Sequence, residues 1–78
     1  MKILLQHART HLYLGDNGRW RVDAEEAYDF QHSKVLIDFV QSHRLSGVQI
    51  AVKFIEAEYD EIVPIPPHQF QPSPRFNQ

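Results

Sequence analysis

Five histidines are the first residues in this sequence that could do chemistry, because imidazole nitrogens are common metal ligands. Their spacing does not favour a metal site. His32 and His43 are expected at the two ends of one helix, roughly 16 Å apart at 1.5 Å per residue. His7 and His11 are expected on opposite sides of a hairpin, and His68 stands apart near the C-terminus. The chain has no cysteine, which excludes disulfides and thiolate ligands, so we predict no metal site and no cofactor.

Carboxylates close to a histidine are the second arrangement with chemical potential. Glu25, Glu26 and Asp29 precede His32, as a general acid–base cluster would require. Helix capping and solvent exposure explain these residues more simply. The sequence has no glycine-rich phosphate loop, no nucleophile elbow and no Cys–His pair, and a chain of 78 residues has little room for a deep pocket. We therefore predict no catalytic residues, no small-molecule substrate and no enzymatic activity.

A third group joins aromatic and arginine side chains on one predicted sheet face. Strand alternation places the candidate binding residues on the exposed side of the sheet, and these are Leu4, His11, Tyr13, Arg19 and Arg21. A patch of this composition is typical of protein interfaces, so a non-enzymatic module acting by protein–protein interaction or self-association is the leading hypothesis. The alternative is single-stranded nucleic-acid binding, which uses the same residue types on open sheets. The net charge of −2 and the absence of a dense Lys/Arg patch argue against that alternative.

Charge is distributed unevenly along the chain. Residues 1–22 carry a net charge of +3, whereas residues 23–63 carry nine carboxylates against three basic residues, a net charge of −6. Such a split favours steering of an anionic partner or head-to-tail association of copies. Chance segregation of charge in a small domain is the alternative explanation.

The elements that must position these side chains begin with three short strands, predicted at 2–5, 11–14 and 19–22. A two-residue turn at Asn17-Gly18 would pair Leu14 with Arg21, whereas a three-residue loop with a left-handed Gly18 pairs Leu14 with Trp20. We favour the three-residue loop, because it puts the apolar residues on one face. The same reasoning predicts Leu5 opposite Leu12 and Ile3 opposite Leu14. The predicted core face of this meander comprises Ile3, Leu5, Leu12, Leu14, Trp20 and Val22.

One helix and one further strand complete the predicted sheet. Asp23 and Glu26 form a possible capping box for a short turn, followed by an extended segment at 27–30. Ser33 is the predicted N-cap of an amphipathic helix that ends near His43 or Arg44. The alternation over 48–54 then predicts a strand whose core-facing residues are Val48, Ile50, Val52 and Phe54. The opposite face of this strand would expose Ala51, and residues 62–63 add a short edge strand.

Several of these features resemble a known pattern. The run Leu12-Tyr13-Leu14, Gly18, Trp20 and Asp23, then Ala27-x-x-Phe30, a helix and a Val-Gln-Ile strand, resembles small bacterial and phage α+β proteins whose function is unknown. The resemblance covers about residues 2–55. It implies a compact α+β module and supplies no catalytic residues.

The resulting prediction is an α+β fold: an antiparallel β-meander, one amphipathic helix on one face, and a further strand joining the sheet. Residues 1–63 are expected to form a single domain, with 64–78 a Pro-rich extended tail because it holds all five prolines. The first residues turn polar too soon for a signal peptide or a membrane span, so a cytoplasmic location is expected.

Overall fold

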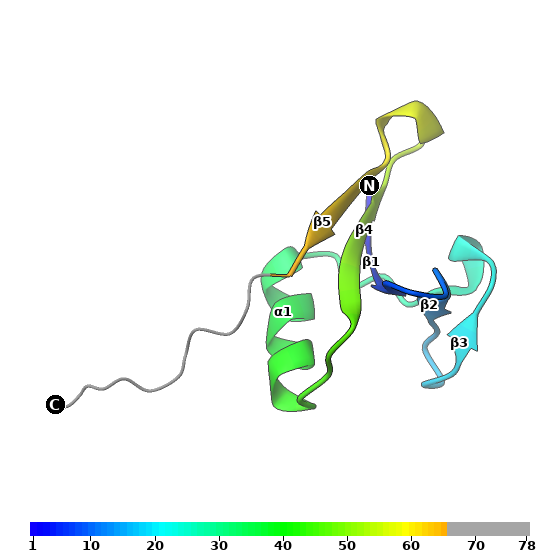
Figure 1. The fold of residues 1–78 in the computed structure, drawn as a ribbon. Coiled ribbons are helices and arrows are strands. Elements are labelled where there is room, and N and C mark those ends of the chain that lie inside the picture. Colours follow the sequence, from blue (N-terminus) through cyan, green and yellow to red (C-terminus); the bar gives the residue numbers. More distant parts are fainter. Residues whose placement is uncertain (66–78) are drawn as a thin grey trace, which may run out of the picture.

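Residues 1–65 form one antiparallel sheet with one helix on one face (Figure 1). The computed structural model describes residues 1–65. The sheet has five strands in the order β3-β2-β1-β4-β5. They are β1 (Lys2–His7), β2 (Tyr13–Leu14), β3 (Trp20–Arg21), β4 (Val48–Lys53) and β5 (Glu61–Pro64), with helix α1 (Ser33–Ser42) and the 3-10 turns η1 (Ala24–Glu26) and η2 (Ala57–Tyr59). The predicted α+β fold, with its meander, single helix and additional strand, is confirmed.

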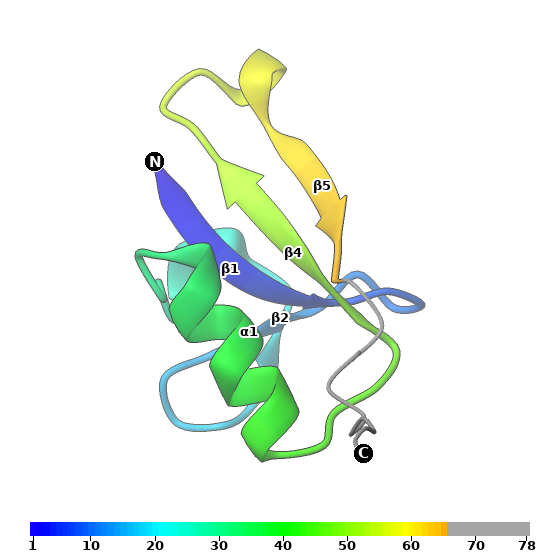
Figure 2. The same cartoon turned by 90° about the vertical axis from the view of Figure 1, so that its left-hand side faces the viewer.

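The core lies between α1 and the sheet. Helix α1 contributes Leu36 and Val40, which pack against β1 and β4 because both strands turn β-branched or leucine side chains to this face. The buried cluster consists of Ile3, Leu5, Phe30, Leu36, Val40 and Ile50. Figure 2 shows α1 on the β1 side of the sheet, with the far end of β4 and β5 projecting beyond it. Among residues 1–65, no helix has the length and apolar character that crossing a bilayer requires.

The second hairpin has the predicted register. Leu14 lies opposite Trp20, and Gly18 adopts a φ of 81°, which the three-residue loop demands. The first hairpin does not have the predicted register. Gln6 pairs with Tyr13, so Leu5 lies opposite Leu14 rather than Leu12.

The His7 side chain stabilises the first turn, which lies one residue further along the chain than the predicted register places it. The Nδ1 atom of His7 accepts hydrogen bonds from the backbone N–H groups of Arg9 and Thr10, both at 3.2 Å. The N–H of His7 itself donates to the carbonyl of Leu12, so the strand continues to His7 before the chain reverses. Because the register moves by an even number of residues, every side chain keeps the face that alternation predicts.

Segment 27–30 completes the edge of β1 that the short strand β2 leaves open. The N–H of Phe30 donates to the carbonyl of Ile3 at 2.9 Å, and the N–H of Ile3 donates to Oδ1 of Asp29 at 3.0 Å. The segment is extended, and Phe30 is buried as predicted. Residue Ala27 forms an isolated bridge with Gly15. These backbone bonds satisfy polar groups of the central strand that would otherwise be unpaired.

Three residues predicted for the core are exposed. Trp20 is 38% exposed, Val22 is 77% exposed and Phe54 is 37% exposed. One helix about 10 Å wide covers roughly two strands spaced by about 4.8 Å. Since α1 covers the centre of the sheet, the two-residue strand β3 lies outside its reach. Trp20 packs edge-on against His7 instead, with ring centroids 5.4 Å apart.

The ends of the helices differ from the sequence prediction in detail. The N-cap of α1 is His32 rather than Ser33, and Asp23 precedes η1 without a side-chain capping bond. The C-terminus of α1 lies where it was predicted. There the N–H of Leu45 donates to the carbonyl of Val40, and the N–H of Arg44 to that of Gln41, which is a Schellman motif. Arg44 occupies the left-handed position of this motif, with a φ of 53°.

Replacing Arg44 by glycine is expected to stabilise the protein. A non-glycine residue in the left-handed region costs about 1 kcal/mol, and glycine removes that cost without disturbing the two C-terminal hydrogen bonds. We expect Arg44→Gly to raise the free energy of unfolding by about 0.5–1 kcal/mol in urea titrations. Arg44→Ala is the matched control and should leave it almost unchanged. A destabilised Arg44→Gly variant would contradict this account of the helix end.

Candidate functional site

Leu4, predicted as an exposed binding residue, has no exposed surface at all. Ala51, which lies opposite Leu4 on β4, is also fully buried although exposure was expected. Gln6, on the same face, is only 5% exposed. The sheet face opposite α1 is therefore closed at its centre, and the prediction of an open face is wrong there. Leu4 is not available for direct contact with a partner.

Two long side chains account for the burial of Leu4. Tyr13 projects from β2 beside Gln6, and Lys53 projects from the end of β4 beside Lys2, both on the face opposite α1. They start from opposite sides of the Leu4–Ala51 pair and meet, with Nζ of Lys53 5.5 Å from the centre of the Tyr13 ring. This is the geometry of a cation–π contact. The phenol ring and the lysine stem together cover the small apolar centre of this face.

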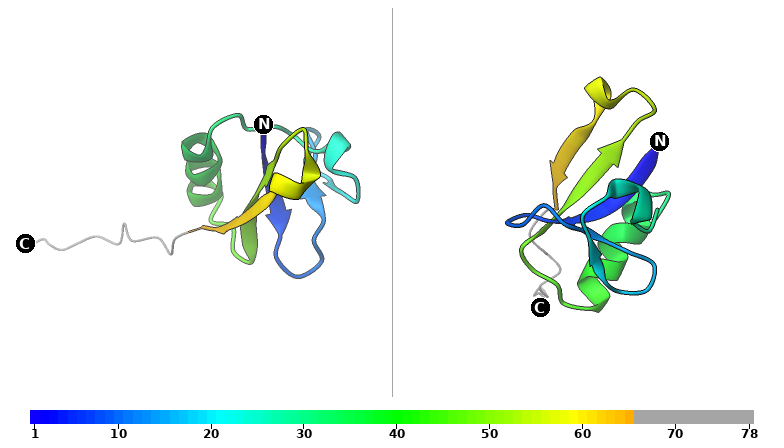
Figure 3. Two further views of the ribbon diagram at one scale, coloured as in Figure 1. Left: turned by 90° about the horizontal axis from the view of Figure 1, so that it is seen from above. Right: turned by 90° about the vertical axis from the view of Figure 1, so that its right-hand side faces the viewer.

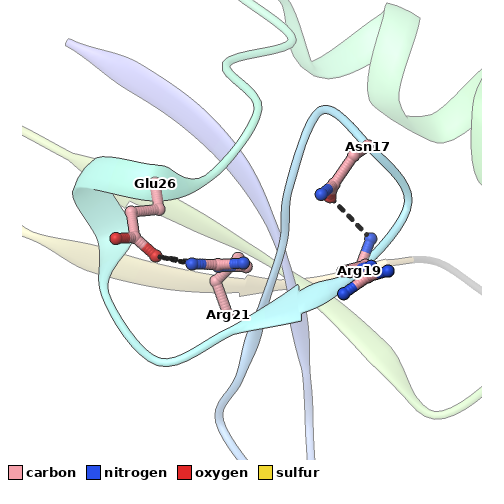
Figure 4. Close-up of polar contacts among 4 residues, drawn as sticks. All are labelled: Asn17, Arg19, Arg21 and Glu26. Atoms are coloured by element: carbon pink, nitrogen blue, oxygen red, sulfur yellow. Dashed lines mark hydrogen bonds and ion pairs between the residues drawn. The ribbon is translucent and has the colours of Figure 1, made fainter.

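Arg21 on β3 lies directly opposite Tyr13 on β2. It therefore continues the row of side chains that Lys53 and Tyr13 begin. The arginine stem passes over Gly15, where an added Cβ would lie 3.1 Å from Cγ of Arg21. Its guanidinium then reaches Glu26, with Nε 2.8 Å and Nη2 2.5 Å from Oε1 (Figure 4). The charge of Arg21 is thus paired with a carboxylate from η1. Glu26 makes this contact in place of the predicted capping box.

Asp60 ties the other end of the row to the loop between β4 and β5. Its Oδ1 accepts a hydrogen bond from the N–H of Phe54 at 2.8 Å, and its Oδ2 lies 3.3 Å from Nζ of Lys53. The bond from Phe54 and then Lys53 lower the pKa of Asp60, while desolvation acts in the opposite direction. Tyr13 and, after it, Asp60 raise the pKa of Lys53 against the effect of burial. We call the row formed by Asp60, Lys53, Tyr13, Arg21 and Glu26 the polar belt.

The remaining predicted residues lie at the turns. His11 has a φ of 64°, and its carbonyl accepts a hydrogen bond from Nε2 of Gln6 at 3.2 Å. Gln6 also accepts a bond from Gln49 at 2.7 Å, so its side-chain amide is held by two partners. Arg19 is exposed, and its backbone N–H donates to Oδ1 of Asn17 (Figure 4). The structure therefore brings Tyr13 and Arg21 together and leaves His11 and Arg19 in the loops.

A shallow depression of about 470 Å³ lies beside the polar belt, and its lining residues are Asp16, Asn17, Arg21, Glu25, Glu26, Ala27, Tyr28 and Asp29. The depression is rich in carboxylates, and its arginine is already paired with Glu26. Within residues 1–65, no group of three or more histidine or carboxylate side chains has the spacing to hold a metal ion.

A second surface carries five of the ten large apolar side chains that are exposed among residues 1–65. We call residues 54–63 the arm. It comprises the loop after β4, turn η2 and most of β5, and it projects from the sheet at the end away from the β2–β3 hairpin (Figures 1 and 3). Its exposed apolar residues are Phe54 at 37%, Ile55 at 98%, Tyr59 at 59%, Ile62 at 51% and Val63 at 37%. Apolar residues alternate with acids over 55–60, and this pattern was the signal for this surface.

The free edge of β5 offers few backbone hydrogen bonds. The backbone groups of Ile3 point away from β4, because they bond to Phe30 and Asp29. Alternation through Val52, opposite Ile3, then turns the backbone groups of Ile62 and Pro64 outward from β5. Proline has no N–H, so Ile62 is the one residue of β5 with an outward donor. Side chains rather than backbone groups are the main binding resource of the arm.

Comparison of this chain with protein-family models, curated proteins and solved structures finds no match. The resemblance to small bacterial and phage proteins receives no support from these comparisons. Function therefore has to be inferred from the geometry of the surfaces themselves.

Removing the Tyr13 ring is expected to destabilise the protein, because the ring covers Leu4 and Ala51. We expect Tyr13→Ala to lower the free energy of unfolding by about 2 kcal/mol, as partial loss of a buried aromatic does. Tyr13→Phe keeps the ring and should cost much less. Tyr59→Ala, which removes a ring that is 59% exposed, is the control and should change little. Equal losses for Tyr13→Ala and Tyr59→Ala in urea titrations would contradict a covering role for Tyr13.

Asp60 is expected to make stability depend on pH in the acid range. Because the folded protein lowers the pKa of Asp60, its contribution is present at neutral pH and is lost as pH falls through that lowered pKa. Asp60→Asn keeps an acceptor for Phe54 but loses the charge, whereas Asp60→Ala loses both. We expect unfolding midpoints at neutral pH to fall in the order wild type, Asp60→Asn, Asp60→Ala. The gap between wild type and Asp60→Asn should close as pH falls below the lowered pKa of Asp60, and a gap independent of pH would contradict the assignment.

Proposed function

We propose that this chain is a small non-enzymatic module that binds a protein partner through the arm. The observation that carries the proposal is the exposure of Ile55 and Tyr59 on a hairpin that projects beyond the reach of α1. Exposing several large apolar side chains of one projecting segment to water is unfavourable, and such segments mark interaction sites. A cytoplasmic location belongs to the same proposal.

Charge on the arm defines the chemistry of the partner. The arm contains Glu56, Glu58, Asp60 and Glu61 and has no lysine or arginine. Lys53 neutralises Asp60 at the base of the arm, whereas no ion pair among residues 1–65 involves the three glutamates. A partner that buries the apolar residues must accept these acids at the rim of the interface. The expected partner surface is apolar in its centre and carries basic side chains around it.

The arm is a better docking surface than the sheet face opposite α1. That face was the predicted site, but its arginine is paired with Glu26 and its tyrosine lies against Lys53. Stacking of a nucleic-acid base on Tyr13 would require displacement of Lys53 and loss of its contact with the ring. The acids of the arm would also repel a phosphate backbone. Protein binding therefore has more support than nucleic-acid binding.

Photo-crosslinking from the arm tests the proposal. A photoreactive residue placed at Ile55 should form covalent adducts with protein in an extract of the source cells. The same residue at Gln41, which is exposed on α1, serves as the control position. We expect unlabelled wild-type protein in excess to suppress the adduct at position 55, because it competes for the same partner surface.

The competitor variant makes this result specific to the arm. Ile55→Asp combined with Tyr59→Asp removes the apolar side chains and should not suppress an adduct with a different protein, provided that its circular dichroism and thermal unfolding match the wild type. Adducts that form equally at positions 55 and 41, or adducts with a different protein that the variant suppresses as well as the wild type does, would overturn the proposal.

A further inference from the structure

We propose that the partner of the arm is a second copy of this chain, which it binds through a surface at the β2–β3 hairpin. We call this surface the hairpin pole and define it by His7, Arg9, Arg19, Trp20 and Val22. The inference rests on the proposed function of the arm and adds the identity of its partner.

The hairpin pole has an apolar centre with basic groups beside it. Trp20 is 38% exposed and Val22 is 77% exposed, and alternation places both on the same side of the chain. The Trp20 ring lies edge-on against His7, whose Nδ1 accepts the N–H of Arg9. Arg19 directly precedes Trp20 in the loop. Tryptophan and arginine are the residue types most enriched among side chains that contribute strongly to protein interfaces.

The charges of the hairpin pole complement those of the arm. Arg9 and Arg19 are exposed, and among residues 1–65 neither takes part in an ion pair. The carboxylates at this end of the sheet line the depression beside Arg21, and alternation places the Arg21 side chain on the face opposite that of Trp20. The arm presents Glu56, Glu58 and Glu61 around its apolar residues. A contact between the arm of one copy and the pole of another therefore unites apolar centres and places acids beside arginines.

A symmetric contact between two arms is less favourable. It would bury the same apolar residues, but it would bring the acids of both copies together and their charges would repel. The sequence pattern already indicated a basic N-terminal part and an acidic part after it. The fold separates the acids of the arm from Arg9 and Arg19, because the arm and the β2–β3 hairpin lie at opposite ends of the sheet (Figures 2 and 3).

This separation determines the kind of assembly. The arm cannot reach the pole of its own chain, so the contact must be intermolecular and heterologous. Each bound copy then still presents one free arm and one free pole, and association continues head to tail unless a ring closes. Since each surface exposes only a few large apolar side chains, we expect weak association that is seen at high protein concentration.

Sedimentation equilibrium of the purified full-length chain tests the inference. We expect the average mass of the wild type to rise with concentration and to pass that of a dimer, and to fall back when salt screens the charges. The arm variant, Ile55→Asp with Tyr59→Asp, and a pole variant, Arg9→Glu with Arg19→Glu, should each remain monomeric at the same concentration. The pole variant keeps Trp20 and its contact with His7, so the hairpin should stay folded, which circular dichroism and thermal unfolding verify.

Mixing the two variants gives the decisive result. The arm variant retains an intact pole and the pole variant retains an intact arm, so an equimolar mixture should form a heterodimer and nothing larger. A pole variant that associates as the wild type does would show contact between arms and overturn the inference, while the proposed function of the arm would stand. A monomeric wild type would also overturn it. The crosslinking at position 55 then shows separately whether the arm binds a different protein.

Discussion

Burial of β1 on both faces is the constraint on which the rest of the structure depends. Leu5 faces α1 and Leu4 faces the opposite side, and neither has any exposed surface. The single ten-residue helix satisfies only the first of these demands. The polar belt covers the face of Leu4. Its long side chains lie over the small apolar centre, and the charged groups pair at the edges as Arg21–Glu26 and Lys53–Asp60. A chain of this size gains a two-sided core without a second helix.

The same limit on covering material explains the two exposed apolar surfaces. Helix and belt both lie over the centre of the sheet, so the strands at its two margins stay uncovered. Trp20 at one margin and Ile62 at the other are exposed for the same reason, because neither α1 nor the polar belt covers them. The margins differ in charge because Arg9 and Arg19 lie at one, whereas Glu56, Glu58 and Glu61 lie at the other. Complementary surfaces at opposite ends thus arise from topology and the order of charges along the sequence.

Alternation and turn chemistry predicted much of the fold, including the α+β class, the helix, the face of each strand residue and the second hairpin. They did not predict the first hairpin, because the bonds of the His7 ring to the turn are a matter of side-chain geometry. They also placed Leu4 and Ala51 on an exposed face. The face of both residues was predicted correctly, but their exposure was not, because Tyr13 and Lys53 reach the centre of this face from distant parts of the sequence. Tyr13 and Arg21 were correctly placed as neighbours, but the apolar character of the arm was hidden among its acids.

The pairing of β1 with β4 also has a consequence for how the chain acquires its structure. Lys2 pairs with Lys53, so the strand that comes first along the described chain finds its long partner near the end of it. During synthesis the leucine-rich strand β1 would remain without its main partner until β4 had emerged from the ribosome. Contacts of such large sequence separation slow folding and prolong the exposure of apolar strands. The His7 turn and the short β2 give β1 an early local neighbour during that interval.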